Sequence, residues 1–209
     1  MSDRPGPPKG QRLGVLVSGR GSNLQALIDA VREGRLQAAI VLVVSNVPDV
    51  PALSKAAAAG IETVVVSHRG WLSREAYDEH LAAMFLARQV DVVCLAGFMR
   101  RLSVRFLEAF SGPVLNVHPS LLPAFPGVGA PSQALAHGVT VAGCTVHLVT
   151  PEIDAGPIVR QAAVPVLRED SAESLAARIL VEEHRLLPEA VARVLAGGWR
   201  IDGRRFVDV

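Results

Sequence analysis

The stretch RLGVLVSGRGSNLQALIDAVREG (residues 12–34) joins an apolar segment, a glycine-containing turn and an amphipathic segment. Residues 12–19 show little alternation with polar residues, which is typical of a strand buried on both faces of a parallel sheet. Between residues 22 and 34, apolar residues recur every three or four positions and a glycine ends the pattern, which predicts a helix. A strand that leads directly into a helix favours an α/β fold.

The same alternation continues along the chain. Further strands are predicted at residues 38–46, 62–67, 90–97 and 113–118, with helices at residues 51–60, 73–89 and 103–110 between them. This order predicts an open, mostly parallel, twisted sheet with helices on both faces, a Rossmann-like architecture. The apolar segments 139–149 and 156–166, joined by the short link TPEIDA, predict an antiparallel hairpin. A long helix at residues 171–196 and a small hairpin at 199–207 are expected to follow.

Composition limits the classes of function. The 209 residues are 50% hydrophobic with a net charge of +1, which favours one domain and argues against a nucleic-acid partner. Residues 1–11 are predicted to be a disordered tail before a single domain at 12–209, because the tail lacks the apolar core of a signal peptide. No apolar run approaches the ~20 residues of a membrane span. Cys94 and Cys144 are expected to be buried free thiols of a cytoplasmic protein.

The turn after the first strand indicates a phosphate site. Gly21, Ser22 and Asn23 stand where the helix begins, so backbone N–H groups and the helix dipole favour an anion, and the Ser22 and Asn23 side chains offer further donors. Leu24 replaces the third glycine of the dinucleotide fingerprint, so a lone phosphate fits better than a dinucleotide. The alternative is a turn and helix cap alone, with Ser22 and Gln25 as a capping box.

Polar residues at the end of another strand indicate a catalytic site. In LNVHPSLLPAFPG (residues 115–127), Asn116 and His118 are two positions apart and therefore share a face of the strand. Asp154, in the TPEIDA link, which we expect to be exposed, should return to the same edge of the sheet, where ligands bind. A carboxylate, an imidazole and an amide together predict proton transfer and oxyanion stabilisation. The alternatives are a structural histidine and a turn aspartate.

The attacking atom is expected to belong to a substrate. No serine or cysteine stands beside His118 in a nucleophile context, and no metal-ligand spacing appears in the sequence. The residues therefore predict direct group transfer between two bound small molecules, one of them phosphorylated.

Six segments carry a family resemblance across residues 13–206. They are SGRGSNLQAL, SREAYD, LAGFMRRLS, LNVHPSLLPAFPG, GCTVHLVTPEIDAGPIV and EEHRLLP, and in this order they resemble the folate-dependent phosphoribosylglycinamide formyltransferases of purine synthesis. The resemblance implies a formyltransferase fold, with a phosphate-binding half at residues 12–110 and a folate and catalytic half at 111–209. It implies transfer of the formyl group of 10-formyltetrahydrofolate, a co-substrate, to the amine of glycinamide ribonucleotide without a metal. The sequence does not fix the oligomeric state and leaves a homodimer open.

The resemblance also assigns residues. It makes Asn116, His118 and Asp154 catalytic and adds Glu183 to the ribonucleotide site at residues 21–23. Folate is expected to contact Arg74, Met99, Arg100, Arg101, Leu102, Asn116, Thr150, Pro151, Glu152, Ile153 and Asp154. It further implies a cis Leu122–Pro123 bond and, with the glycines nearby, a segment at 124–132 that is mobile without folate.

The chain departs from the family pattern at two positions. Gly129 stands where a histidine is common, and Arg101 stands where an aliphatic residue is usual. If mainly backbone lines the folate site there, the Arg101 side chain can point to water.

Two other functions fit the same fold. A formyltetrahydrofolate hydrolase would let water attack the formyl carbon, and such proteins usually carry a regulatory domain before the first strand. A non-catalytic phosphate-binding α/β domain would leave Asn116, His118 and Asp154 without a role. A methionyl-tRNA formyltransferase is disfavoured because it needs a basic surface for tRNA.

Overall fold

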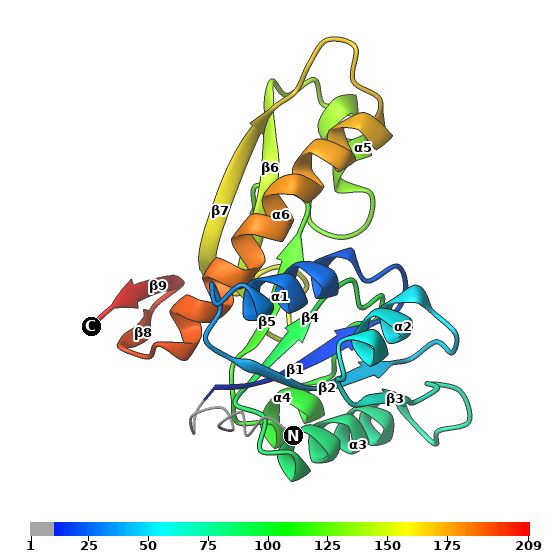
Figure 1. Cartoon of the computed structure of the whole chain (residues 1–209). Helices are drawn as coiled ribbons and strands as arrows, with labels where there is room; N and C mark the ends of the chain where they lie inside the picture. The colour runs from blue at the N-terminus through cyan, green and yellow to red at the C-terminus, as the bar shows by residue number, and fades with distance from the viewer. Residues whose placement is uncertain (1–10) are drawn as a thin grey trace.

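The computed structural model describes residues 11–209 and shows an α/β fold (Figure 1). Residues 1–10, most of the predicted disordered tail, lie outside the described residues. Gln11, the last residue of that predicted tail, already pairs with the sheet, because its carbonyl accepts the Ala39 N–H at 2.9 Å.

A nine-stranded sheet forms the centre of the described structure, in the order β3-β2-β1-β4-β5-β6-β7-β9-β8. Its parallel part consists of β1 (Arg12–Val17), β2 (Ala39–Ser45), β3 (Thr63–Val65), β4 (Val92–Leu95) and β5 (Val114–His118). Its remaining strands are β6 (Val141–Leu148), β7 (Ile158–Pro165), β8 (Trp199–Asp202) and β9 (Arg205–Asp208). The parallel pairing of β1 to β5 confirms the predicted mostly parallel sheet. The β6–β7 and β8–β9 pairs are antiparallel, which confirms both predicted hairpins.

Helices cover both faces of the parallel part. One face carries α1 (Ser22–Arg32), α2 (Pro51–Ala58) and α6 (Ala172–Leu195), and the other carries α3 (Arg74–Ala87) and α4 (Val104–Ala109). In β1, Val15 and Val17 pack into the first layer and Leu16 into the second, which explains why the strand is apolar throughout. Gly14 lets α3 approach closely, since a Cβ there would lie 2.5 Å from the Phe85 ring.

The short helix α5 (Ala130–Ala136) was not predicted. Its seven residues are too few to show a reliable helical period, and isolated helices of this length are unstable in water. Ala130 and Ala134 are buried, and α5 packs against α6, so tertiary packing supplies its stability.

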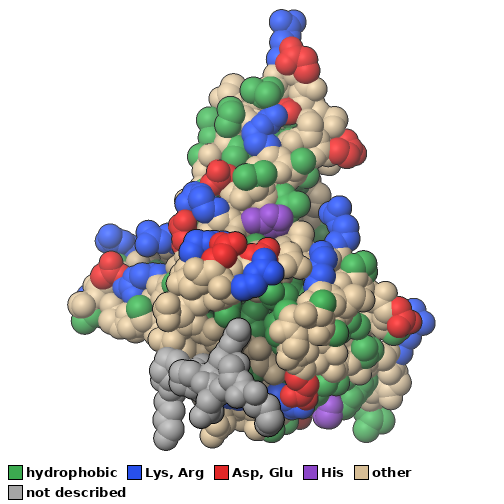
Figure 2. Space-filling model, viewed as in Figure 1, with side chains coloured by type: hydrophobic (Ala, Val, Ile, Leu, Met, Phe, Trp, Pro, Cys, Tyr) green, Lys and Arg blue, Asp and Glu red, His purple; other side chains and the backbone are tan. Residues whose placement is uncertain are grey.

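The surface and the buried thiols agree with the composition. Figure 2 shows basic and acidic side chains next to one another over one face, as a net charge of +1 would suggest. Cys94 and Cys144 are free and buried, as predicted. Among residues 11–209, every helix is too short or too polar to cross a bilayer.

Candidate active site

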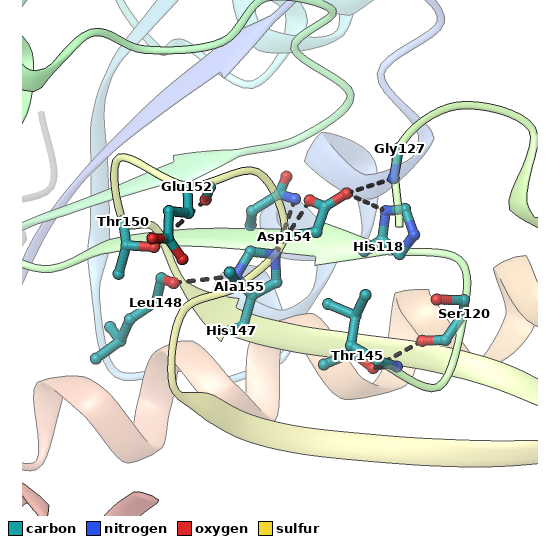
Figure 3. A network of polar contacts seen from close by, with 12 residues as sticks. His118, Ser120, Gly127, Thr145, His147, Leu148, Thr150, Glu152, Asp154 and Ala155 are labelled. Carbon is teal, nitrogen blue, oxygen red and sulfur yellow. Dashed lines mark hydrogen bonds and ion pairs between the residues drawn. The ribbon is translucent and has the colours of Figure 1, made fainter. Parts of the chain in front are cut away.

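The last residue of β5, His118, faces Asp154 at the carboxyl end of the strand (Figure 3), and it also contacts the Phe125 carbonyl. Its Nδ1 lies 3.4 Å from Asp154 Oδ2, and its Nε2 lies 2.9 Å from the Phe125 carbonyl oxygen. Both partners are hydrogen-bond acceptors, so an imidazolium with a proton on each nitrogen satisfies both contacts at once. His118 is 5% exposed, and its ring is held between the two.

Asp154 lies at the centre of the polar cluster. Its Oδ2 accepts the Gly127 N–H at 2.8 Å, and its Oδ1 lies 3.6 Å from His147 Nε2. Burial alone would raise the pKa of Asp154, but the contacts with His147, Gly127 and His118 outweigh it and hold this pKa below its ordinary value. The carboxylate is therefore ionised at neutral pH.

The backbone of this link is unusual, and its exposure differs from the prediction. Asp154 has a φ of 49°, in the left-handed region that few residues other than glycine adopt. The expectation of an exposed link is wrong for this side chain, which is only 12% exposed. The left-handed conformation accompanies a carboxylate directed under the loop at Gly127 rather than toward solvent.

His147 is the site residue that sequence reasoning missed. It lies on β6 directly opposite Asn116, is 2% exposed, and its Nε2 is 3.2 Å from Asn116 Nδ2. Its Nδ1 is 3.0 Å from the Leu148 carbonyl. Its Nε2 therefore faces both the Asn116 amide and the Asp154 carboxylate, so His147 links these two predicted site residues. The available signal was a histidine inside an otherwise apolar strand.

The proline-rich turn after His118 is held by the β6–β7 hairpin. Thr145 Oγ1 donates to the Ser120 carbonyl at 2.7 Å and accepts the Leu122 N–H at 3.0 Å. Gln161 Nε2 donates to the Leu122 carbonyl at 3.0 Å. The Leu122–Pro123 bond is cis, as predicted. Mobility of segment 124–132 without folate stays a prediction.

The predicted phosphate turn has the required backbone, and the alternative of a capping box at Ser22 and Gln25 is wrong. Gly21, with a φ of 67°, is the residue that precedes α1, and no side chain caps the helix. Gly21 also packs so closely that a Cβ would lie 2.6 Å from Ala52 Cβ. Lys55 Nζ donates to the Arg20 carbonyl at 2.8 Å, which brings a positive charge to this turn. Backbone N–H groups at the start of α1 therefore remain to bind an anion.

The structure joins Asn23 to Glu183, although 160 residues separate them. Asn23 Nδ2 donates one of its two N–H groups to Glu183 Oε2 at 2.8 Å, so a role of this side chain as a donor to phosphate, through the second N–H, stays a prediction. Both residues are buried, and burial raises the pKa of Glu183 above its ordinary value, with the Asn23 hydrogen bond opposing the shift. A surface cavity of about 340 Å³ lies beside them, lined by Ser22, Lys55 and His184 among others.

Glu183→Gln is expected to stabilise the fold increasingly as the pH rises. Above about pH 4.5 the unfolded chain loses the carboxyl proton before the folded chain does, so the free energy of unfolding falls until the folded-state pKa is passed. Each pH unit between the two pKa values is worth about 1.4 kcal/mol, or roughly 3–5 °C of Tm for a chain of this size. Glutamine carries no charge and still accepts the Asn23 N–H.

Thermal melting of wild type and Glu183→Gln over a pH series would check this expectation. The Tm advantage of Glu183→Gln should grow with pH and then level off. The neighbour Glu182, which is half-buried and paired with Arg185, supplies the control variant Glu182→Gln, which should show no such growth. A Tm difference for Glu183→Gln that is independent of pH contradicts the prediction.

Most of the predicted folate contacts form two segments, residues 99–102 and 150–154, while Arg74 begins α3 and Asn116 lies on β5. In residues 99–102, Met99 is 74% exposed and Leu102 is 3% exposed, so Leu102 can offer folate only its backbone. Arg101 is exposed, but its guanidinium donates to the Pro151 carbonyl of the second segment instead of facing water alone. This hydrogen bond connects the 99–102 segment to the 150–154 link. Within residues 11–209, no three candidate ligands are grouped to hold a metal ion.

Comparisons with known proteins agree on one family. A family model described as formyl transferase matches residues 11–191. The chain is 43% identical over 190 residues to the phosphoribosylglycinamide formyltransferase of Escherichia coli (strain K12), covering 91% of this chain and 87% of that protein. Among solved structures, glycinamide ribonucleotide transformylase 1 from Symbiobacterium toebii is 49% identical with a TM-score of 0.93, covering 97% of this chain and 96% of that chain.

Some relatives are much longer. The trifunctional purine biosynthetic protein adenosine-3 of Bos taurus is 48% identical over 194 residues, which is 93% of this chain. The chain spans only 19% of the length of that protein.

Proposed function

Because the chain belongs to the formyl transferase family, we propose that it is a phosphoribosylglycinamide formyltransferase. It transfers the formyl group of 10-formyltetrahydrofolate to the amine of glycinamide ribonucleotide, a step of purine synthesis. The observation that carries the proposal is the contact of His118 with Asp154, 3.4 Å apart, at the sheet edge where the two predicted binding regions meet.

The two substrates would approach this cluster from different sides. The ribonucleotide phosphate binds the backbone at residues 21–23, with Glu183 from the second half of the chain beside it. The folate lies between the 99–102 segment and the 150–154 link. The reacting amine and the formyl carbon then meet at Asn116 and His118.

The reaction is a direct transfer. The amine nitrogen attacks the formyl carbon, the bond from that carbon to the folate nitrogen breaks, and the amine loses a proton while the folate nitrogen gains one. The formyl oxygen becomes negative on the way, and the His118 imidazolium and the second N–H of Asn116 Nδ2 stabilise it. To do so, His118 Nε2 exchanges the Phe125 carbonyl for the formyl oxygen. Asp154, ionised at neutral pH, stabilises the imidazolium and offers a base for the amine proton.

One assay tests the proposal directly. Consumption of 10-formyltetrahydrofolate by the purified protein is measured with and without glycinamide ribonucleotide, and we expect consumption only when the ribonucleotide is present. Equal consumption without it identifies a hydrolase. No consumption under either condition identifies a protein that binds without catalysis.

A further inference from the structure

The 99–102 segment is anchored at both ends by side chains from other elements. The Met99 N–H donates to Ser18 Oγ at 2.9 Å, just beyond the end of β1. The Ser103 N–H donates to Asp78 Oδ2 of α3 at 2.6 Å. Between these anchors the segment has no helix or strand structure, so side-chain contacts must determine where its backbone lies.

The burial of the Asp78 carboxylate costs free energy. It is 1% exposed, and burial raises its pKa above the ordinary value. Removing a carboxylate from water is costly unless charged or hydrogen-bonding partners compensate for the loss. A role in fixing the backbone of the 99–102 segment would explain why a buried aspartate is present here.

Tyr77, the residue before Asp78, contacts Arg100 in the middle of the same segment. The Arg100 guanidinium lies over the Tyr77 ring, 5.3 Å from its centroid, and the Tyr77 hydroxyl donates to the Val66 carbonyl at 3.1 Å. Arg100 also acts electrostatically on Asp78. Consecutive residues of α3 therefore contact both the middle and the end of the segment.

We propose that Asp78 is a positioning residue for the folate. By accepting the Ser103 N–H, it holds the backbone of residues 99–102 in the position that folate binding requires. This proposal rests on the proposed function, because it takes that segment as a wall of the folate site. The side chains of Met99 and Arg101 are exposed on the segment, whereas Leu102 is buried beneath it. A shift of its Ser103 end therefore displaces groups that would face the ligand.

Two variants of Asp78 and one matched control test the proposal. Asp78→Ala removes the acceptor, whereas Asp78→Asn keeps an oxygen that can accept the Ser103 N–H. Phe85→Leu is the control, because Phe85 lies fully buried on the same helix and packs against the α4 residue Phe106, but its ring cannot accept the Ser103 N–H. Steady-state KM values for both substrates, Tm, and calorimetric binding of tetrahydrofolate are measured for each variant.

Asp78→Ala is expected to raise the KM for 10-formyltetrahydrofolate and the Kd for tetrahydrofolate by about ten-fold or more, since a buried donor is left unpaired. The KM for the ribonucleotide should stay near the wild-type value. Asp78→Asn should recover most of the folate affinity. Phe85→Leu should lower Tm without a selective change in either KM.

Two results would overturn the proposal: equal increases of both KM values in Asp78→Ala, or the same folate defect in Phe85→Leu at a similar loss of Tm. If Asp78→Ala does not fold, Asp78→Asn and Ser18→Ala test the proposal instead. Ser18→Ala removes the hydrogen bond at the other end of the segment. Unchanged tetrahydrofolate binding in Ser18→Ala would then refute the anchoring of the segment. A wild-type protein that transfers no formyl group refutes the proposed function instead.

Discussion

Replacing Asp154 with asparagine is expected to lower kcat by about 10²–10⁴-fold, the usual contribution of general acid–base groups. Asparagine has the same shape, and it tolerates the left-handed conformation of this position, so the fold should be retained. The variant loses the charge that faces His118 Nδ1, and with it the stabilisation of the imidazolium and the base for the amine proton. The ribonucleotide binds at another part of the site, so its affinity should survive.

Asp49 offers a matched control for this substitution. It is also an aspartate with a left-handed backbone, at φ 54°, but it is exposed and lies in the loop before α2. Asp49→Asn makes the same chemical change at a comparable backbone position and should leave kcat unchanged. Turnover, ribonucleotide binding and Tm are measured across a pH series, and the pH dependence of kcat should change only in Asp154→Asn, because coupled groups titrate together.

Two outcomes would count against a catalytic Asp154. Near-normal turnover in Asp154→Asn would make the residue a turn aspartate. Loss of turnover together with ribonucleotide binding and Tm would indicate structural damage rather than lost chemistry.

Gly21→Ala is expected to raise the KM for glycinamide ribonucleotide by about 10²-fold, because small displacements at a binding site have effects of this size. The residue has a φ of 67°, which costs an L-residue about 1–2 kcal/mol, and the new Cβ would lie 2.6 Å from Ala52 Cβ. Relief of this clash must move the start of α1 away from α2, together with the N–H groups proposed to bind phosphate. The KM for 10-formyltetrahydrofolate should change little.

Gly19→Ala is the control within the same turn. Nothing lies within 4 Å of a Cβ at Gly19, and its φ is not in the left-handed region, so alanine fits there without strain. Steady-state kinetics with each substrate varied in turn compare the two variants. Equal increases of both KM values in Gly21→Ala, or a similar ribonucleotide defect in Gly19→Ala, would contradict a phosphate site at this backbone.

The sequence by itself determined the order and type of most elements. The apolar residues 12–19, the helical period of residues 22–34 and the short link between residues 149 and 156 predicted β1, α1 and the β6–β7 hairpin, which the structure contains. These patterns involve residues two to four positions apart, whose relations a strand or a helix fixes by its own geometry. The spacing of Asn116 and His118 belongs to the same class of local information.

Local patterns left two questions open in the phosphate turn. The Ser22 and Gln25 pair fits a capping box, but the structure makes Gly21 the residue before α1 and leaves the helix without a side-chain cap. Asn23 is predicted to donate to phosphate, and the structure shows that one of its two amide N–H groups is committed to Glu183. Glu183 is 160 residues away from Asn23 along the chain, so no local pattern could report this contact.

Only the tertiary structure decided which polar groups meet. The β5–β6 register places His147 opposite Asn116, and a shift of one residue would send the imidazole to the other face of the sheet. The packing of α3 brings Asp78 to Ser103, and the return of the β6–β7 link brings Asp154 to His118. Such contacts depend on strand register and on how layers pack, and these are set by the sum of many weak apolar contacts across the whole chain rather than by the residues that meet.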